Sequence, residues 1–183
     1  EDGEVLARGP NITSGYLNRA EATAEAFTDD GWFRTGDLGS LDDDGFLTIT
    51  GRKKELFKTS AGKYIAPVKI EARLKAVSFL QEAVLLGDAH HFCVALFALD
   101  PENFAEWALK EGIPAEPGHP RVREVLQAHV TAVNGTLASF ESVKYFEVLP
   151  GPMTVDGGEL TASLKVKRRV VSTKYADLIE GMY

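Results

Sequence analysis

The sequence contains one cysteine, Cys93, and therefore forms no disulfide within the chain. Structural disulfides belong mainly to oxidising compartments, so their absence favours a reducing compartment, and we expect the cytoplasm. The apolar run around this cysteine reads FCVALFAL and is far shorter than the roughly 20 residues that cross a bilayer. The sequence shows no signal-peptide pattern, in which a basic segment is followed by an apolar one. We expect no transmembrane segment, although the sequence leaves peripheral contact with a membrane open.

The sequence also lacks a spaced set of cysteine, histidine and acidic residues of the kind that encloses a metal ion. Its adjacent histidines, His90 and His91, are interpreted as a polar turn before a strand. Cys93 has no flanking cation that would activate a thiolate, so it is interpreted as a buried apolar residue. Phe104 and Trp107 are interpreted as core or interface residues.

The charge of the chain is acidic and unevenly distributed. Its net charge of −7 argues against nonspecific binding to nucleic acid. Residues 1–51 carry 11 acids and 3 bases, whereas residues 52–183 carry 16 acids and 17 bases. This asymmetry predicts two domains that meet near residue 51. The chain begins at Glu1 rather than methionine and opens within a pattern, so we expect a fragment of a longer protein.

The pattern of residues 1–51 predicts a mostly β unit with one small helix. GEVLARGP is typical of a short strand that ends at a Gly-Pro breaker. Asn18 followed by Glu21 resembles a capping box, which predicts a short helix that ends at Phe27. WFRTGDLGSL predicts a strand and loop, and the turn at residues 42–45 predicts a hairpin into the strand FLTIT.

Residues 52–183 predict a compact α+β domain with a central mixed sheet covered by helices. Two short strands flank a turn at Ser60, Ala61 and Gly62, and a helix is expected over residues 67–77. EAVLLGD and FCVALFALD predict buried strands. Helices are expected from Asp100 to Lys110 and along Val122 to Leu137. A strand in VKYFEVL, a loop and one terminal helix in KVKRRVVSTKYADLIEG complete the prediction.

The stretch from Trp32 to Pro67 carries the strongest functional signal. It places Asp37 a short distance before a dense run of cations, namely Arg52, Lys53, Lys54, Lys58 and Lys63. A carboxylate on a glycine-bearing turn can accept hydrogen bonds from two adjacent hydroxyls, such as a ribose diol. Cations beside it can hold phosphate or carboxylate groups. The stretch therefore predicts a nucleotide site at the junction of two structural units.

WFRTGDLG together with GRKKELFKTSAGKYIAPVKIE resembles two core motifs of the adenylate-forming superfamily, which includes acyl-CoA synthetases, nonribosomal-peptide adenylation domains and firefly luciferase. GEVLARGPNITSGYLN is similar to the motif just upstream in that family, and ELTASLKVKRR is similar to its final lysine motif. The motifs occur in family order over essentially the whole chain. The spacing and the C-terminal tail resemble the long-chain fatty-acid–CoA ligase branch most.

The resemblance implies a two-step reaction. A fatty acid and ATP give acyl-AMP and pyrophosphate, and coenzyme A then gives acyl-CoA and AMP. Residues 1–51 would be the end of the large adenylation domain, and residues 52–183 would be the small mobile domain that rotates between the steps. The family's phosphate loop and acyl pocket are absent from this sequence, so the fragment alone is not expected to catalyse the full reaction. The implied Mg²⁺ would travel with ATP and be held mainly by the part outside this chain.

The resemblance assigns several residues to the nucleotide. Asp37 matches the aspartate that holds both ribose hydroxyls; its alternative is a residue that caps a turn. Arg52 matches an arginine that reaches the ribose or phosphate, with a plain surface arginine as the alternative. Ile49 matches an apolar position near the nucleotide, or is simply a core residue of its strand. Lys63 stands where some relatives have a phosphate-contacting arginine.

Further positions match the hinge and the thiol step. Lys54 matches the hinge, with a solvated lysine as the alternative. Lys58 matches a lysine on the face that forms the thioester, and Ser60, Ala61 and Gly62 match the loop that lines the pantetheine tunnel. Ala61 departs from the family, which usually has glycine there; a positive φ at this position would strain an alanine.

Lys165 matches the catalytic lysine of adenylation. An ammonium between the carboxylate and the α-phosphate offsets their repulsion, more strongly in the transition state. The register of LTASLKVKR favours Lys165 over Lys167, while the alternative is that the charge run KVKRR is merely a solvated helix start.

Three other functions share part of this pattern. An aryl- or short-chain acid–CoA ligase would have the same motifs, as would an adenylation enzyme that loads a carrier protein. A noncatalytic interaction module on this fold is an alternative of another class, against which the retention of Asp37, Arg52 and Lys165 speaks.

Overall fold

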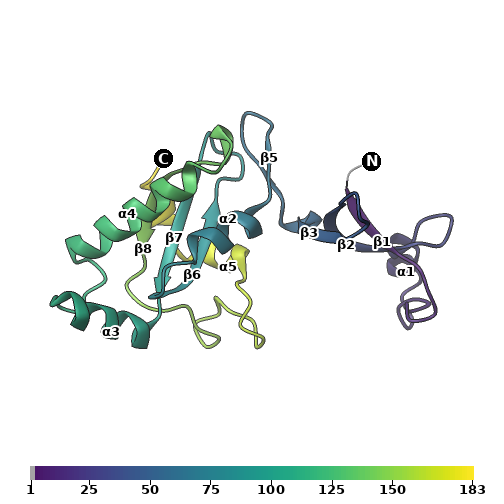
Figure 1. Ribbon diagram of the computed structural model, residues 1–183. Coiled ribbons are helices and arrows are strands. Elements are labelled where there is room, and N and C mark those ends of the chain that lie inside the picture. Colours follow the sequence, from purple (N-terminus) through teal and green to yellow (C-terminus); the bar gives the residue numbers. More distant parts are fainter. Residues whose placement is uncertain (1–2) are drawn as a thin grey trace. The chain divides into compact units, whose positions relative to one another are not determined.

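The computed structural model describes residues 3–183, which fold as two compact units. Unit 1 extends to Leu56 and unit 2 runs from Phe57 to Tyr183. In Figure 1, unit 1 has the purple and dark blue colours of the N-terminal part, and unit 2 continues to yellow. The sequence predicts the seam at residues 51 and 52, and the chain passes from one unit to the other a few residues later.

Unit 1 is built on an antiparallel sheet of β1 (Glu4–Ala7), β2 (Phe33–Leu41) and β3 (Leu47–Arg52), in that order. The predicted hairpin between β2 and β3 is confirmed. Asp42 shapes its turn, because its Oδ1 accepts hydrogen bonds from the backbone amides of Asp44 at 3.1 Å and Phe46 at 2.8 Å. Gly45 has a φ of 83°, which a residue with a side chain rarely adopts.

The short helix α1 (Ala20–Ala26) begins later than predicted, and the expected capping box is absent. Arg19 occupies the N-cap and makes no side-chain cap bond, whereas Asn18 has a left-handed φ of 55°. Thr23 supplies the local connection instead: its hydroxyl accepts from the Tyr16 amide at 2.9 Å and donates to the Arg19 carbonyl at 2.8 Å. The side chain that bonds to the backbone at the start of α1 is therefore Thr23, which lies within the helix, rather than a residue before it.

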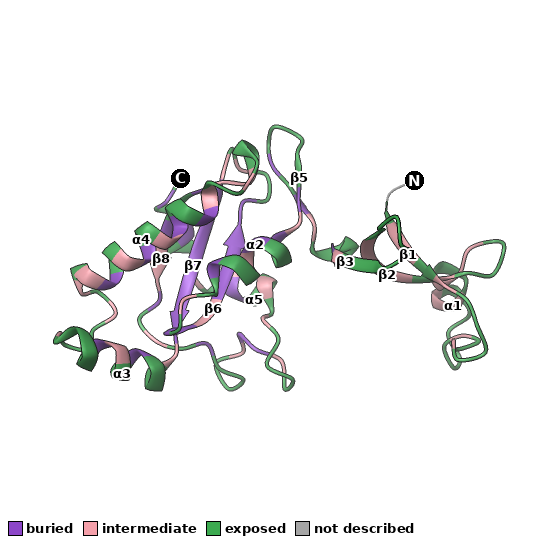
Figure 2. Cartoon of the chain, in the orientation of Figure 1, coloured by how far each residue is buried: buried purple, intermediate pink, exposed green. Residues whose placement is uncertain are grey.

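Unit 2 is organised by a mixed sheet of β6 (Leu80–Leu86), β7 (Cys93–Leu99) and β8 (Val143–Val148). The central strand β7 is antiparallel to β6 and parallel to β8. All seven residues of β7 are buried, and Figure 2 shows this strand in purple among green and pink helices. The predicted α+β class, with a mixed sheet covered by helices, is confirmed.

Alternation along β7 sends side chains to two hydrophobic clusters, one on each face of the sheet. Cys93 and Phe97 belong to the first cluster, whereas Val94 and Leu96 belong to the second. The first is packed with α2 (Pro67–Leu74), α3 (Pro101–Glu111) and α4 (Pro120–Asn134). The second is packed with α5 (Arg168–Lys174) and α6 (Ala176–Glu180).

The buried aromatic and sulfur side chains lie where the sequence predicts. Phe104 is 4% exposed and Trp107 packs against the same cluster, with their rings 5.9 Å apart. Cys93 is fully buried, and burial raises the pKa of its thiol to about 11. Such a thiol is protonated near neutral pH and is a poor nucleophile.

Three predicted helices are shorter than expected. The helix after Pro67 ends at Leu74, and the long helix ends at Asn134 because the Asn134 side chain turns to β8. The side-chain nitrogen Nδ2 of Asn134 donates to the Val143 carbonyl at 2.8 Å, and its Oδ1 accepts from the Val143 backbone amide at 2.9 Å. The terminal helix is divided at Tyr175 into α5 and α6. The Asp100 cap is confirmed, since its carboxylate accepts from the Asn103 amide at 2.9 Å.

Candidate functional site

Asp37 and Arg52 form the best-defined polar pair of unit 1. They are cross-strand partners on β2 and β3, and Arg52 Nε donates to Asp37 Oδ1 at 2.7 Å. The Asp37 side chain is 30% exposed and that of Arg52 is 59% exposed, so both remain accessible. The hydrogen bond and charge of Asp37 raise the pKa of Arg52. Strand pairing therefore presents a carboxylate and a guanidinium side by side.

The backbone before Asp37 is held by Thr35. Its hydroxyl donates to the Val5 carbonyl on β1 at 2.6 Å and accepts from the Asp37 amide at 3.1 Å. Gly36 between them has a φ of 73°. Asp37 itself lies within β2, and among residues 3–183 no backbone amide donates to its carboxylate. Within the described residues the Asp37 carboxylate therefore does not cap a turn, and its role at the nucleotide stays a prediction.

Ile49 does not belong to a buried core in this chain. It lies on β3, opposite Gly39 of β2, and is 52% exposed. An exposed β-branched side chain on a strand is available for contact with a ligand or with another protein segment. The alternative interpretation of Ile49 as a core residue finds no support within the described residues.

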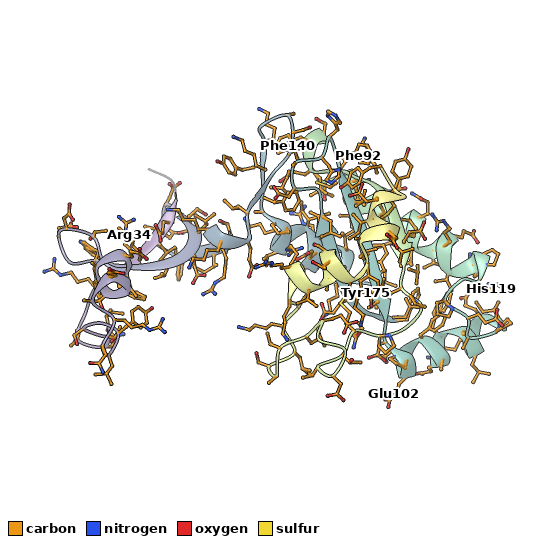
Figure 3. The ribbon with its side chains drawn as sticks, turned by 180° about the vertical axis from the view of Figure 1, so that it is seen from behind. Arg34, Phe92, Glu102, His119, Phe140 and Tyr175 are labelled. Carbon is orange, nitrogen blue, oxygen red and sulfur yellow. The ribbon has the colours of Figure 1, made fainter. Side chains whose placement is uncertain are left out.

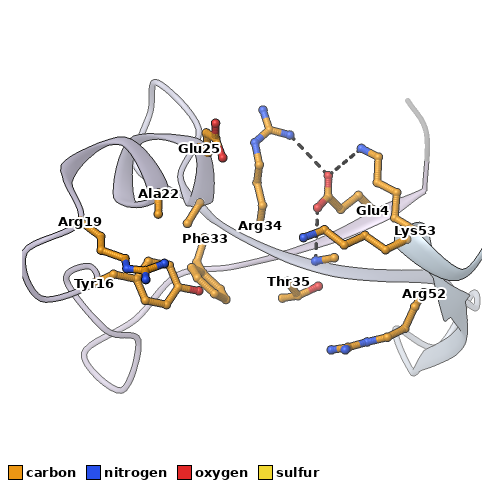
Figure 4. A pocket seen from close by; sticks show the side chains of 13 residues that line it. Glu4, Tyr16, Arg19, Ala22, Glu25, Phe33, Arg34, Thr35, Arg52 and Lys53 are labelled. Carbon is orange, nitrogen blue, oxygen red and sulfur yellow. Dashed lines mark hydrogen bonds and ion pairs between the residues drawn. The ribbon is translucent and has the colours of Figure 1, made fainter. Parts of the chain in front are cut away.

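A basic cavity of about 560 Å³ lies within unit 1 (Figure 4). Glu4 lies in its lining and accepts hydrogen bonds from Lys53 Nζ at 3.0 Å, Arg34 Nη1 at 3.4 Å and the Gly36 amide at 3.3 Å. The hydrogen bond from Lys53 is the main cause of the lowered pKa of Glu4. Sequence reasoning missed Glu4, because only the pairing of β1 with β2 brings it to these cations. The cavity is lined by Glu4, Tyr16, Arg19, Ala22, Glu25, Ala26, Phe33, Arg34, Thr35, Gly36, Arg52, Lys53 and Lys54.

The predicted hinge residue, Lys54, lies in the middle of a one-turn 3-10 helix, η1 (Lys53–Glu55). Lys53 is tied to unit 1 through Glu4. The Lys54 ammonium makes no hydrogen bond or ion pair with any residue from 3 to 183. The chain leaves unit 1 after Leu56, so Lys54 lies close to where the two units separate.

The predicted thiol-face residues share one hairpin, formed by β4 (Phe57–Lys58) and β5 (Tyr64–Ile65). Gly62 carries the left-handed φ of this turn, 77°, whereas Ala61 has no positive φ. The turn therefore uses Gly62 for its unusual backbone conformation, and Ala61 is unstrained. Thr59 closes the turn, because its amide donates to the Lys63 carbonyl at 3.0 Å and its carbonyl accepts from the Gly62 amide at 2.8 Å.

The loop that carries the two histidines holds this hairpin. The Ser60 amide donates to the His90 carbonyl at 2.9 Å, and the Ser60 hydroxyl lies 2.9 Å from His91 Nδ1. The His90 ring stacks on the Tyr183 ring at 3.7 Å. The histidines form a polar turn as expected, but sequence reasoning missed its contact with the hairpin, which joins segments about thirty residues apart.

Two predicted site lysines lie over aromatic rings. Lys58 Nζ is 5.5 Å from the centre of the Tyr64 ring, and Lys63 Nζ is 5.9 Å from that of Phe140. Attraction between a cation and a ring face is modest at exposed positions. It orients the side chains without neutralising them, so both ammonium groups can still meet an anion.

Lys165 lies in a second tight loop, which we call the lysine loop (residues 159–167). Leu160 and Val166 form an isolated antiparallel bridge. Between them, the Thr161 amide donates to the Lys165 carbonyl at 2.8 Å, and the Lys165 amide donates to the Thr161 hydroxyl at 3.0 Å. Leu164 has a φ of 60°, a strained conformation for a residue with a side chain.

The Lys165 ammonium is exposed and has no hydrogen-bonding partner among residues 3–183. α5 begins at Arg168, so Lys165 belongs to the loop rather than to a helix start, whereas Lys167 is the N-cap residue. Lys165 therefore lies outside the helix that the charge run was expected to begin, although its ammonium is exposed to solvent, and its catalytic role stays a prediction. Its placement on a tight turn distinguishes it from Lys167.

A partly buried ion pair connects Arg168, just after the lysine loop, to α2. Both terminal nitrogens of Arg168 bind the Glu71 carboxylate, at 2.6 and 3.0 Å, and one also donates to the Leu85 carbonyl at 2.6 Å. The Leu85 amide in turn donates to Glu71 at 2.7 Å. Arg168 thus joins α5 to α2 and β6.

The hairpin and the lysine loop lie at opposite ends of unit 2. In Figure 1 the hairpin, near the β5 label, lies at the top of unit 2 and the yellow-green lysine loop at the bottom. Figure 3 shows the same separation from behind, with Phe140 at the hairpin end. The structure therefore does not bring Lys165 together with Lys58, Ser60, Ala61 and Gly62.

Within residues 3–183, no helix has the length and apolar character needed to span a membrane. Nor do these residues bring together three or more histidine, cysteine, aspartate or glutamate side chains in an arrangement suited to a metal ion.

A family profile described as "AMP-binding enzyme C-terminal domain" matches residues 55–183. Among curated proteins, the chain is similar to the long-chain-fatty-acid–CoA ligase FadD15 of Mycobacterium tuberculosis, with 45% identity over 100% of this chain and 31% of the relative. It is 37% identical to the peroxisomal long chain acyl-CoA synthetase 7 of Arabidopsis thaliana, over 99% of this chain and 27% of the relative. The chain thus spans about a third of the length of these relatives or less.

Solved structures of adenylating enzymes are also similar. The A-PCP didomain of carboxylic acid reductase from Segniliparus rugosus, in complex with AMP, matches with a TM-score of 0.77 and 26% identity, over 99% of this chain and 24% of that chain. ATP-bound MatB from Rhodopseudomonas palustris matches with a TM-score of 0.66 and 26% identity, over 96% of this chain and 31% of that chain.

Proposed function

The chain belongs to the family of AMP-binding enzyme C-terminal domains, and on this premise we propose that it is the C-terminal part of an AMP-forming long-chain fatty-acid–CoA ligase. Relatives that carry this activity in their names are 45% and 37% identical over essentially the whole chain. One observation of the structure supports the proposal most: the hairpin with Lys58 and Lys63 and the lysine loop with Lys165 lie at opposite ends of unit 2. A domain that serves two successive reactions needs two such faces.

In the first reaction, a carboxylate oxygen of the fatty acid attacks the α-phosphorus of ATP. An acyl–phosphate bond forms and pyrophosphate leaves. Lys165, whose ammonium is exposed and unpaired among the described residues, stabilises the negative charge that gathers between the two reactants. A Mg²⁺ ion bound to ATP would be held mainly by the part of the protein outside this chain and would offset the charge of the phosphates.

The nucleotide is oriented by unit 1. Asp37 accepts hydrogen bonds from both ribose hydroxyls, while Arg52, whose Nε lies 2.7 Å from Asp37 Oδ1, reaches the ribose or phosphate. Ile49, which is 52% exposed, contacts the nucleotide through its apolar side chain. From unit 2, Lys63 on the β4–β5 hairpin contributes a positive charge to the phosphate side, without the bidentate geometry of arginine.

In the second reaction, the thiol of coenzyme A loses its proton and its sulfur attacks the acyl carbon. A thioester bond forms, the bond to AMP breaks, and AMP leaves. Lys58 and the turn of Ser60, Ala61 and Gly62 line the path of the pantetheine arm. Rotation about Lys54, near the point where the units separate, exchanges the two faces of unit 2.

Loading of a carrier protein is the second candidate. The likeness to a carboxylic acid reductase didomain titled A-PCP favours it. A pantetheine arm uses the same turn whether it belongs to coenzyme A or to a carrier. The higher identity to proteins named as CoA ligases favours the first candidate.

The test is to assay the full-length protein that contains this chain with a panel of fatty acids. We expect exchange of pyrophosphate into ATP that depends on a long-chain acid, followed by AMP release that depends on free coenzyme A. Preference for a phosphopantetheinylated carrier protein would establish the second candidate. Failure to exchange pyrophosphate with any carboxylic acid would refute both and support a noncatalytic interaction module.

A further inference from the structure

Glu159 is a buried carboxylate at the start of the lysine loop, and the reaction described above does not use it. It is 2% exposed and is the one charged residue in the buried class among residues 3–183. Its Oε1 accepts from Lys174 Nζ at 2.5 Å and from the Tyr175 hydroxyl at 3.0 Å. Both donors come from the end of α5, where Tyr175 is labelled in Figure 3.

The backbone of Glu159 closes the base of the lysine loop. Its carbonyl accepts from the Lys167 amide at 2.7 Å, on the far strand of the loop. The adjacent residue, Leu160, is 4% exposed, packs in the second hydrophobic cluster and is bridged to Val166. Glu159 therefore connects the loop to α5 through its side chain and connects the two sides of the loop through its main chain.

The electrostatics keep this carboxylate ionised. Burial opposes ionisation, but the hydrogen bonds from Lys174, from the backbone and from Tyr175 lower the pKa of Glu159 to about 2. Burial and the same contact raise the pKa of Tyr175 to about 12. At neutral pH the group is therefore an anion with a cation and a hydroxyl at fixed positions. Lys174 also donates to the Gly157 carbonyl at 3.3 Å, just before the loop.

A buried ion pair adds little net stability compared with apolar side chains of the same volume, because desolvation offsets the attraction between the charges. The ion pair does, however, fix the segments that it joins in a single arrangement. The lysine loop needs such a restraint, since it holds a strained Leu164 and carries Lys165 on an exposed turn. A displacement of about 1 Å at a reacting group can cost about a hundredfold in rate.

We propose that Glu159 is a positioning residue for adenylation: through Lys174 and Tyr175 it holds the lysine loop so that Lys165 meets the reacting carboxylate and phosphate in one place. This inference rests on the proposed function, in which Lys165 serves the first reaction and not the second. Glu159 touches neither substrate nor reacting atoms. Its removal should therefore affect one reaction through Lys165 and leave the other unchanged.

The kinetic test uses Glu159→Gln in the full-length protein. We expect pyrophosphate exchange to fall about ten- to a hundredfold, because the isosteric amide no longer binds Lys174 as an ion pair. Thioester formation from supplied acyl-AMP should stay within about twofold of the wild type. Lys174→Met should reproduce the loss and Lys174→Arg should retain most of the activity, since arginine keeps the positive charge.

A matched control removes a carboxylate from another Glu–Lys pair of unit 2. Glu82 on β6 pairs with Lys75, the residue just after α2, at 2.7 Å and away from the lysine loop. Glu82→Gln should leave both reactions unchanged. If Glu159→Gln fails to fold, Tyr175→Phe removes one hydrogen bond of the same carboxylate and should show the same selective loss to a smaller degree, about threefold.

A readout independent of activity is hydrogen exchange of the backbone amides in the same preparations. Glu159→Gln should speed exchange at Lys165 and Lys167 by about tenfold or more relative to β7, because these amides close the loop. Equal loss in both reactions, or unchanged exchange in the loop, would overturn the proposal. A wild type without pyrophosphate exchange would instead refute the proposed function, and the exchange data would still decide whether Glu159 holds the loop.

Discussion

The two units of this chain differ in how they bury hydrophobic side chains. Every buried hydrophobic side chain among residues 3–183 belongs to unit 2, where two clusters cover both faces of a mixed sheet. Unit 1 has regular strands and a well-formed hairpin, yet Phe46 is 71% exposed and Leu17 is 90% exposed. Hydrogen-bonded strands alone therefore do not make a core. The difference indicates that unit 1 needs apolar surface from elsewhere, whereas unit 2 provides its own.

The largest effect should follow from separating the units. A chain of residues 57–183 should unfold in one cooperative transition, whereas residues 1–56 alone should show none, because so small a unit without buried side chains cannot offset its conformational entropy. Calorimetry and urea titration of the two chains would measure this. A sharp transition of the shorter chain would break the comparison.

Adenylation should depend on both units, but in different ways. Lys165→Ala should lower the rate of pyrophosphate exchange about a hundredfold or more, and leave thioester formation from supplied acyl-AMP nearly unchanged. Asp37→Ala in unit 1 should mainly raise the KM for ATP, because its proposed role is to hold the ribose. Steady-state kinetics of each half-reaction provide the measurement. Comparable losses of Lys165→Ala in both reactions would refute its assignment.

Apolar truncations should sharpen the contrast in burial. Leu96 is fully buried on β7, and Leu96→Ala should destabilise unit 2 by about 2–5 kcal/mol. Phe46→Ala in unit 1 removes a larger side chain but should change stability by less than about 0.5 kcal/mol, because that ring is already in solvent. Urea midpoints of the two variants would be compared. A large cost for Phe46→Ala would show that unit 1 has a core after all.

Acid should weaken unit 2 through Glu159. Its folded pKa of about 2 lies below the unperturbed value of 4.5, so its stabilisation is complete above pH 4.5 and is lost as the pH falls toward 2. This shift of the Glu159 pKa corresponds to about 3 kcal/mol in the free energy of unfolding. Urea unfolding between pH 6 and 2 should show a steeper loss for the wild type than for Glu159→Gln. Parallel pH profiles would contradict this assignment.

The smallest effect concerns the connection between the units. Lys54→Pro fixes φ beside the point where they separate and should slow one half-reaction about tenfold more than the other, because it hinders rotation rather than chemistry. Lys54→Ala is the matched control and should leave both rates nearly unchanged. Equal loss, or no loss, in both half-reactions for Lys54→Pro would remove Lys54 from the hinge.

Much of unit 2 could be predicted because local patterns and tertiary packing agree there. The apolar residues 83–86 of β6, the apolar run of β7, the helix signal at Pro67 and the Asp100 cap all specify the elements that form. Predictions failed at element ends, where a distant partner competes. The long helix stops at Asn134 because its side chain binds Val143, and no local signal reveals that contact.

The order of motifs along the chain was sufficient to indicate the family, and the reaction and the residues proposed to carry it rest on the same motifs. Local chemistry was also sufficient for the turn at Gly62, since glycine readily adopts the φ of 77° that the turn requires. Only folding decides at which ends of unit 2 the hairpin and the lysine loop lie. Folding also creates the contact of Ser60 with His91 and the attachment of the lysine loop to α5 through Glu159. Each joins residues that are apart in sequence, and a hydrogen bond between them exists only once burial and strand pairing have brought them within 3 Å.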